Sequence, residues 1–119
     1  MPSSRNGFPF DQSAVNHIAP QQLKHRLSDA AAPLLLDVRE PWEFQICRIP
    51  GSLLMPMGTV VARHTELAPE AETVVICHHG ARSMQVAMFL ENAGFTRVYN
   101  LSGGVDAWAR TVEASMPVY

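Results

Sequence analysis

The chain has 119 residues, of which 47% are hydrophobic and 17% charged, and its formal net charge is −2 at pH 7. This length and composition fit one soluble globular domain with a single core, and they exclude disordered and fibrous classes. The charge gives no electrostatic basis for binding nucleic acid or an anionic membrane surface. No apolar run is long enough for a membrane span, and residues 1–16 lack the basic-then-apolar order of a signal peptide. With two cysteines and no secretory segment, we expect a reducing, cytoplasmic location and no disulfide framework.

Short apolar segments alternate with helical patterns along most of the chain. Residues 1–16 are rich in Ser, Pro, Asn and Gly, so we predict a loose N-terminal tail followed by one domain over residues 17–119. The predicted strands are His17–Ile18, Leu34–Val38, Leu53–Met55, Thr73–Ile76 and Arg97–Leu101. The predicted helices begin at Pro20, Pro41, Thr59, Ser83 and Val105. Such an alternation is typical of βα units and predicts an α/β fold, with a parallel sheet covered by helices on both faces.

One stretch in the middle of the chain combines a strand, a tight loop and a helix. The β-branched run Thr73–Ile76 has the character of a strand that is buried on both faces. From Ser83 onward apolar residues recur at three- and four-residue steps, and Gly94 stands where a helix C-cap is expected. The loop between them, Cys77–Arg82, follows the carboxyl end of the strand, where open parallel sheets bind their ligands.

Cys77 is the first residue of this loop, and its position predicts a reactive thiol. A loop that leads from a strand into a helix N-terminus directs successive backbone N–H groups into one concavity, which binds anions. The helix dipole and the Arg82 guanidinium both favour the thiolate of Cys77 over the thiol. A thiolate held by backbone amides is a nucleophile, so we predict a catalytic cysteine rather than an inert buried one.

Three groups of residues carry a resemblance to a known family. They are the segments Leu35–Phe44 and Ile49–Ser52, the loop Cys77–Ser83, and the segment Leu101–Gly104 with Ala107 and Trp108. On these residues the chain resembles the rhodanese-like domain family, the single-domain sulfurtransferases, over most of its length. The resemblance implies a three-layer α/β fold with a five-stranded parallel sheet between helices. It also implies the transfer of a sulfane sulfur through a persulfide on the loop cysteine.

The resemblance assigns roles to the residues of the loop. Cys77 corresponds to the nucleophile that forms the persulfide. The residues of the cradle that binds thiosulfate and then the persulfide are His78, His79, Gly80, Ala81, Arg82 and Ser83. The implied partners are thiosulfate as a small-molecule sulfur donor, a thiol or cyanide as acceptor, and a sulfur-relay protein. No metal and no organic cofactor is implied.

Arg82 and its charged neighbours leave two interpretations open. The Arg82 guanidinium either holds the substrate sulfonate or pairs with a carboxylate such as Asp37 at the neighbouring strand end, and we favour the pairing. Asp37 and Arg39 are expected to be scaffold rather than chemistry. The chain has Cys47-Arg48 where many relatives carry Gly-His, a departure that we expect to leave the loop intact. Cys47 itself is predicted to be a small packed residue rather than a second redox thiol.

Other functions compete with sulfur transfer from thiosulfate. Phosphatase and arsenate reductase relatives need a longer cradle to enclose a phosphoryl group, whereas only four residues separate Cys77 from Arg82 and none of them is acidic. A metal at His78 and His79 is disfavoured, because adjacent residues in one turn rarely converge on one ion and no spaced second pair exists. A partner-fed persulfide carrier, or a sulfur-sensing module without turnover on thiosulfate, needs the same loop and stays open.

Several conspicuous apolar residues are expected to pack in the core. Trp42 and Trp108 fall on helical apolar faces. In the third predicted helix, Val60 and Val61 are expected to face inward, with His64 as a further candidate. Four methionines are expected to fill gaps in the packing: Met55, Met57, Met84 and Met88.

Overall fold

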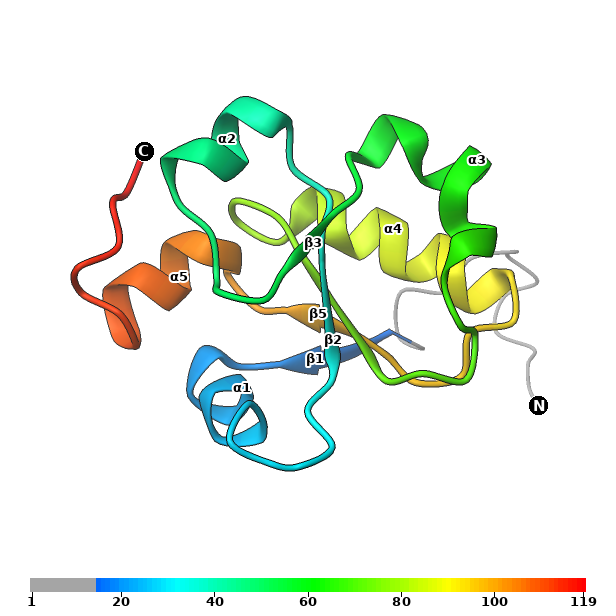
Figure 1. The fold of residues 1–119 in the computed structure, drawn as a ribbon, viewed down its shortest axis with the longest axis horizontal. Helices are drawn as coiled ribbons and strands as arrows, with labels where there is room; N and C mark the ends of the chain where they lie inside the picture. Colours follow the sequence, from blue (N-terminus) through cyan, green and yellow to red (C-terminus); the bar gives the residue numbers. More distant parts are fainter. Residues whose placement is uncertain (1–14) are drawn as a thin grey trace.

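The computed structural model describes residues 15–119, so most of the predicted N-terminal tail lies outside the described residues. Five parallel strands form one sheet in the order β1-β5-β4-β2-β3 (Figure 1). The strands are β1 (Asn16–Ile18), β2 (Leu34–Asp37), β3 (Leu53–Leu54), β4 (Thr73–Ile76) and β5 (Val98–Leu101). The predicted five-stranded parallel sheet is confirmed, and β4 lies at its centre between β5 and β2.

Helices cover both faces of the sheet. They are α1 (Pro20–Arg26), α2 (Pro41–Ile46), α3 (Val60–Arg63), α4 (Ala81–Asn92) and α5 (Gly104–Thr111), with the 3-10 turns η2 (Met57–Thr59) and η3 (His64–Glu66) on either side of α3. Figure 1 shows α3 and α4 on one side of the sheet and α1 and α5 on the other. The predicted three-layer α/β arrangement is confirmed. Among the described residues, no helix is both long and apolar enough to cross a membrane.

The central strands β2, β4 and β5 are interior because successive side chains point to opposite faces and both faces are covered. Leu36 of β2 and Val75 of β4 pack in the core under α3 and α4, while Leu35 and Val74 pack in the core under α1 and α5. None of these four side chains is more than 3% exposed. This double burial explains why β2 and β4 are mostly apolar runs in the sequence.

The methionines and one of the two tryptophans pack as predicted. Met55 is fully buried, and three further methionines pack against the core under α3 and α4: Met57, Met84 and Met88. Trp108 of α5 is buried in the opposite core, and its indole Nε1 donates a hydrogen bond to Glu113 at 3.1 Å. These side chains contribute packing rather than chemistry.

Two residues that were predicted to be in the core lie on the surface. Trp42 is 60% exposed and Val61 is 69% exposed. Trp42 belongs to the six-residue helix α2, in which the buried position is taken by Glu43. The third predicted helix is divided into η2, α3 and η3, so its residues do not share one continuous face. Val60 is buried as predicted, and His64 is half-buried.

Candidate active site

The loop from Cys77 to Gly80 leaves the carboxyl end of β4 at the centre of the sheet and leads into α4 (Figure 1). Gly80 has a φ of 108°, a left-handed conformation that residues with a side chain rarely adopt. The backbone conformation therefore explains why a glycine stands at this position of the loop. Helix α4 begins directly afterwards with the exposed residue Ala81, so its unpaired N-terminal N–H groups adjoin the loop.

The first turn of α5 fixes the backbone of this loop. Val105 donates its N–H to the carbonyl of Cys77 at 2.9 Å, and Asp106 donates its N–H to the carbonyl of His78 at 3.1 Å. Gly104 allows this close approach, because a Cβ atom there would lie 2.4 Å from the Cys77 oxygen and 2.3 Å from the His78 oxygen. The strand-to-helix turn after β5 therefore supports the one after β4.

The Cys77 sulfur is enclosed by the loop and surrounded by hydrogen-bonding groups. The residue is only 1% exposed. The Gly80 N–H donates to Sγ at 3.0 Å, and the Ser83 hydroxyl lies 3.2 Å from Sγ. A backbone amide at this distance, next to a helix N-terminus, stabilises negative charge on the sulfur. The site is therefore built to hold a thiolate or another anionic sulfur species.

Ser83 also connects the sulfur to β5. Its hydroxyl donates a hydrogen bond to Oδ1 of Asn100, while Nδ2 of Asn100 donates to the Gly80 carbonyl at 3.2 Å. A hydroxyl has one proton, so Ser83 cannot donate to Asn100 and to the sulfur at once. In this arrangement Ser83 accepts a hydrogen bond from the Cys77 thiol, and its hydroxyl must rotate before it donates to the thiolate.

Arg82 is paired with Glu43 of α2. Its two terminal guanidinium nitrogens donate to the two carboxylate oxygens at 2.7 and 2.9 Å. The Glu43 side chain is 5% exposed and that of Arg82 is 35% exposed. The hydrogen bonds from Arg82 lower the pKa of Glu43 to about 2, so the carboxylate is charged at neutral pH. A structural pairing was expected, but Asp37 was the wrong partner.

Asp37 is occupied by Arg39, two residues further along the chain. Both side chains are completely buried, and Arg39 Nη2 donates to Asp37 at 2.8 Å. Arg39 also donates to the carbonyl of Cys47 at 2.6 Å, and its Nη1 lies 3.8 Å from the Cys47 sulfur. Because both Asp37 oxygens already accept hydrogen bonds from Arg39, Arg82 turns to another carboxylate. The buried pair is scaffold, and Cys47 is packed beside it.

The two histidines of the loop form a stack whose geometry does not suit a metal ion. The rings of His78 and His79 lie with their centroids 3.9 Å apart and an angle of 26° between their planes. Together with Asp106 they bring three ligand atoms within 4.8 Å of one another. A histidine nitrogen binds a metal along its lone pair, which lies in the plane of the ring. Two nearly parallel ring planes at this separation do not converge on one ion.

His78 is the more enclosed of the two histidines. Burial lowers its pKa below the ordinary value, and the neighbouring His79 adds to the effect, so the His78 ring is neutral at pH 7. The His79 side chain is 66% exposed, with Nε2 3.9 Å from the carboxylate of Asp106. The loop therefore presents no fixed positive charge from His78.

The model of the rhodanese-like domain family matches residues 19–111 of the chain. The chain belongs to this family. A sulfurtransferase of Allochromatium vinosum is 41% identical to it over 81% of this chain and 90% of that protein. A thiosulfate sulfurtransferase of Ectopseudomonas mendocina is 32% identical over 83% of this chain and 89% of that protein. The solved structure of a rhodanese-like domain protein from Staphylococcus aureus superposes with a TM-score of 0.77 at 26% identity, covering 88% of this chain and 99% of that one.

Four residues of this rhodanese-like site were not predicted from the sequence. They are Glu43, Asn100 and Asp106, whose contacts are given above, and Tyr119, whose ring stacks on His78. Glu43 lies in the first turn of a helix, where an acidic residue is common for reasons of capping and helix dipole alone. Asn100 is a single polar residue in an apolar strand, and that irregularity is the signal that could have identified it.

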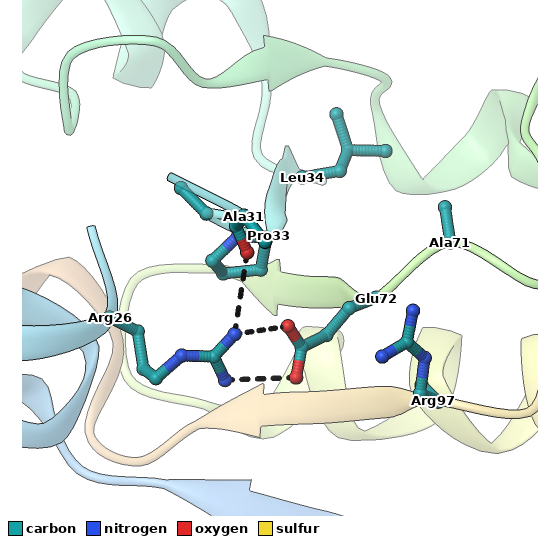
Figure 2. A pocket seen from close by; sticks show the side chains of 8 residues that line it. Arg26, Ala31, Pro33, Leu34, Ala71, Glu72 and Arg97 are labelled. Atoms are coloured by element: carbon teal, nitrogen blue, oxygen red, sulfur yellow. Dashed lines mark hydrogen bonds and ion pairs between the residues drawn. The ribbon is translucent and has the colours of Figure 1, made fainter. Parts of the chain in front are cut away.

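A cavity of about 530 Å³ lies on the side of the rhodanese-like sheet where the strands begin, at the opposite end of the strands from Cys77 (Figure 2). It is lined by Arg26, Ala31, Ala32, Pro33, Leu34, Ala71, Glu72 and Arg97, which surround the amino ends of β2, β4 and β5. Figure 2 shows the Arg26 guanidinium facing both oxygens of Glu72, and Arg26 also donates to the Ala31 carbonyl. The guanidinium is thus used in holding α1 against the sheet, away from Cys77.

Proposed function

We propose that the protein is a sulfurtransferase that carries a sulfane sulfur as a persulfide on Cys77. The observation that carries this proposal is the environment of the Cys77 sulfur, which accepts the Gly80 N–H at 3.0 Å beside the N-terminus of α4. Such an environment stabilises a thiolate and, equally, the anionic persulfide that sulfur transfer builds on it. The sulfurtransferases among its relatives support the same class of reaction.

The reaction consists of two displacements at sulfur. In the first, the Cys77 thiolate attacks the outer sulfur of thiosulfate, the S–S bond of thiosulfate breaks, and sulfite leaves with the electron pair. In the second, cyanide or an acceptor thiolate attacks the outer sulfur of the persulfide, and Cys77 leaves as a thiolate. Both rates depend on the thiolate fraction and on the nucleophilicity of the attacking sulfur.

The residues that follow Cys77 bind the reactants rather than react with them. The backbone amides of the loop, led by that of Gly80, hold the sulfonate of the donor and then the outer sulfur of the persulfide. Ser83 turns its hydroxyl from Asn100 to the Cys77 sulfur when that sulfur is charged. The N–H groups of Arg82 that Glu43 does not use are free to donate to the donor.

A second candidate function is that of a carrier that receives its sulfur from the persulfide of a partner protein. The charge balance around the loop favours it, because Glu43 neutralises Arg82 and the His78 ring is neutral at pH 7. Thiosulfate is a dianion, whereas a persulfide donor has a single ionisable sulfur. The site therefore attracts thiosulfate less strongly than it would if the Arg82 guanidinium had no carboxylate partner. The chemistry at Cys77 is the same for both donors.

Thiocyanate formation from thiosulfate and cyanide tests the proposal. We expect Cys77→Ser to lose turnover completely, because serine cannot form a persulfide, and Cys47→Ser to keep it. The second variant is the matched control, since Cys47 is the other cysteine of the chain and packs in the opposite core. Intact mass after thiosulfate alone should show one added sulfur on the wild-type protein and none on Cys77→Ser.

The other outcomes distinguish the alternatives. Loading of Cys77 from a low-molecular-weight persulfide but not from thiosulfate would favour the carrier. Hydrolysis of an aryl phosphate by the wild-type protein, lost in Cys77→Ser, would favour the phosphatase chemistry that the short loop argues against. The absence of added sulfur with either donor would contradict the enzyme and the carrier alike.

A further inference from the structure

The Tyr119 hydroxyl joins two ion pairs at the edge of the site. It accepts a hydrogen bond from Arg39 Nη1 at 2.8 Å and donates one to Glu43 Oε2 at 2.8 Å. Arg39 is bound to Asp37 at the end of β2, and Glu43 is bound to Arg82 in the first turn of α4. The hydroxyl is thus the link in a chain of hydrogen bonds that runs from the sheet to the active-site helix.

The ring of Tyr119 packs against the active-site loop itself. It stacks on the His78 ring with the centroids 3.9 Å apart and an angle of 6° between the planes. His78 also stacks on His79, and Trp42 meets the Tyr119 ring edge-on at 5.9 Å. Tyr119 therefore packs directly against the residue next to the nucleophile, and the exposed Trp42 contacts the same tyrosine ring.

The phenol of Tyr119 is suited to this bridging position. Burial raises its pKa to about 12, so the hydroxyl keeps its proton at neutral pH. A neutral hydroxyl accepts from a guanidinium and donates to a carboxylate at the same time, which neither phenylalanine nor a charged side chain can do. The bridge between Arg39 and Glu43 therefore depends on this functional group.

We propose that Tyr119 is a positioning residue of the active site, whose ring holds one side of the loop and whose hydroxyl holds the other, so that the loop amides stay directed at the Cys77 sulfur. The ring holds His78, and the hydroxyl holds Arg82 through Glu43. These two anchors flank the residue whose N–H binds the sulfur, so a shift of either one displaces that donor. The activity readout rests on the proposed function, and the structural readout does not.

Two variants separate the ring from the hydroxyl. Tyr119→Phe keeps the ring over His78 and removes the bridge between the ion pairs, whereas Tyr119→Ala removes both. Tyr99→Phe is the matched control at the other tyrosine of the chain, because Tyr99 lies on β5 among residues of β1 and α1. Thermal unfolding of all four proteins establishes that each variant is folded at the assay temperature.

The first readout is the rate at which Cys77 takes up sulfur in a single turnover, followed by intact mass at saturating thiosulfate or glutathione persulfide. We expect Tyr119→Phe to slow loading about fivefold, the equivalent of one net hydrogen bond, and Tyr119→Ala to slow it by at least about tenfold. The thiosulfate concentration for half-maximal loading should rise as well, because the loop amides that Tyr119 positions also hold the sulfonate of the donor. A merely structural role would lower the melting temperature and leave the rate of the folded protein unchanged.

The second readout does not depend on sulfur transfer. The His78 imidazole is titrated by NMR in each protein. Removing the Tyr119 ring exposes His78 to water, so its pKa should rise towards the ordinary value in Tyr119→Ala and stay low in Tyr119→Phe. The charged groups that face His78, namely His79, Asp106 and Glu43, are the same in every variant, and the hydrogen bond that the Tyr119 backbone makes with His78 does not depend on the side chain at position 119.

Wild-type loading rates in both Tyr119 variants, or an unchanged His78 titration in Tyr119→Ala, would overturn the proposal. A wild-type protein that takes no sulfur from either donor would instead contradict the proposed function, and the His78 titration would still decide whether Tyr119 holds the loop. The two failures are therefore distinguishable.

Discussion

Arginine–carboxylate pairs lie at both ends of the strands, and they differ in their surroundings. We call the side of the sheet where the strands begin the amino edge and the side where they end the carboxyl edge. At the amino edge Arg26 of α1 binds Glu72, with the arginine side chain 35% exposed and the carboxylate 12% exposed (Figure 2). At the carboxyl edge Arg39 binds Asp37 with both side chains completely buried. Water screens a partly exposed pair, so its contribution to stability is small, whereas breaking a buried pair costs about 3–5 kcal/mol. Breaking an arginine–carboxylate pair should therefore lower the free energy of unfolding more at the carboxyl edge than at the amino edge.

The pairs also differ in what they are connected to. The amino-edge pair joins the end of α1 to the residue before β4. At the carboxyl edge Arg82 stands in the first turn of α4, next to the Cys77 loop, and Tyr119 couples its partner Glu43 to Arg39. A change at the carboxyl edge should alter stability and sulfur transfer together, whereas a change at the amino edge should alter stability alone.

The largest effect on stability is expected from Arg39→Met, which leaves the Asp37 carboxylate buried without its partner. We expect the free energy of unfolding to fall by about 3–5 kcal/mol, measured by urea unfolding at neutral pH. Adding Asp37→Leu removes the uncompensated charge and should restore part of the loss. The carbonyls of Glu43 and Cys47 still lack the donor that Arg39 supplied, so recovery should be incomplete. If Arg39→Met cost less than about 1 kcal/mol, the buried pair would contribute no more to stability than an ion pair on the surface, and this prediction would be wrong.

A smaller and pH-dependent effect is expected from Glu43→Gln. The folded pKa of Glu43, about 2, lies below its ordinary value of 4.5, so the carboxylate contributes stability above pH 4.5 that is lost as the pH falls towards 2. At pH 7 the variant should lose about 1–3 kcal/mol of unfolding free energy. The loss is limited because the partner Arg82 is partly exposed, so water screens its interaction with Glu43. Below pH 4.5 the difference between wild type and variant should shrink.

Urea unfolding across this pH range measures the difference, with Glu66→Gln as the control. Glu66 forms an exposed ion pair with Arg63, with side chains 56% and 41% exposed, so its removal should change stability little at any pH. Sulfur loading at pH 7 should also slow in Glu43→Gln and not in Glu66→Gln. If the unfolding free energies of wild type and Glu43→Gln changed equally with pH, the pKa of Glu43 would not differ between the folded and unfolded states, and this prediction would be wrong.

The parts of the site that are local in the sequence could be predicted, and the parts that join distant segments could not. Strand β4, the loop from Cys77 and helix α4 follow one another, so apolar pattern and glycine position were enough to place them. The carboxylate that binds Arg82 lies 39 residues earlier, and Tyr119 reaches Glu43 from 76 residues away. A pairing over such separations leaves no periodic signal in a single sequence, which is why Asp37 was named instead.

The errors in the core have a related cause. Trp42 and Val61 belong to helices of six and four residues, which make fewer than two turns. A hydrophobic face is recognised by repetition at three- and four-residue steps, and these helices end before the step repeats. In α4, with 12 residues, the same reasoning recognised the helix, but the apolar face was predicted from Met84, Ala87, Met88 and Ala93. Of these only Ala87 is among the buried residues of α4, the others being Ser83, Val86 and Leu90.

The smallest effect is expected from Arg26→Ala at the amino edge. The variant removes the guanidinium that Glu72 and the Ala31 carbonyl share, yet water screens the pair, so we expect a small loss of stability that shrinks further in high salt. Sulfur loading on Cys77 should proceed at the wild-type rate. Urea unfolding in low and high salt, together with the loading assay, measures both quantities. Slower loading in Arg26→Ala would show that the two edges are coupled, and β4, which runs from the residue after Glu72 to the residue before Cys77, would be the route.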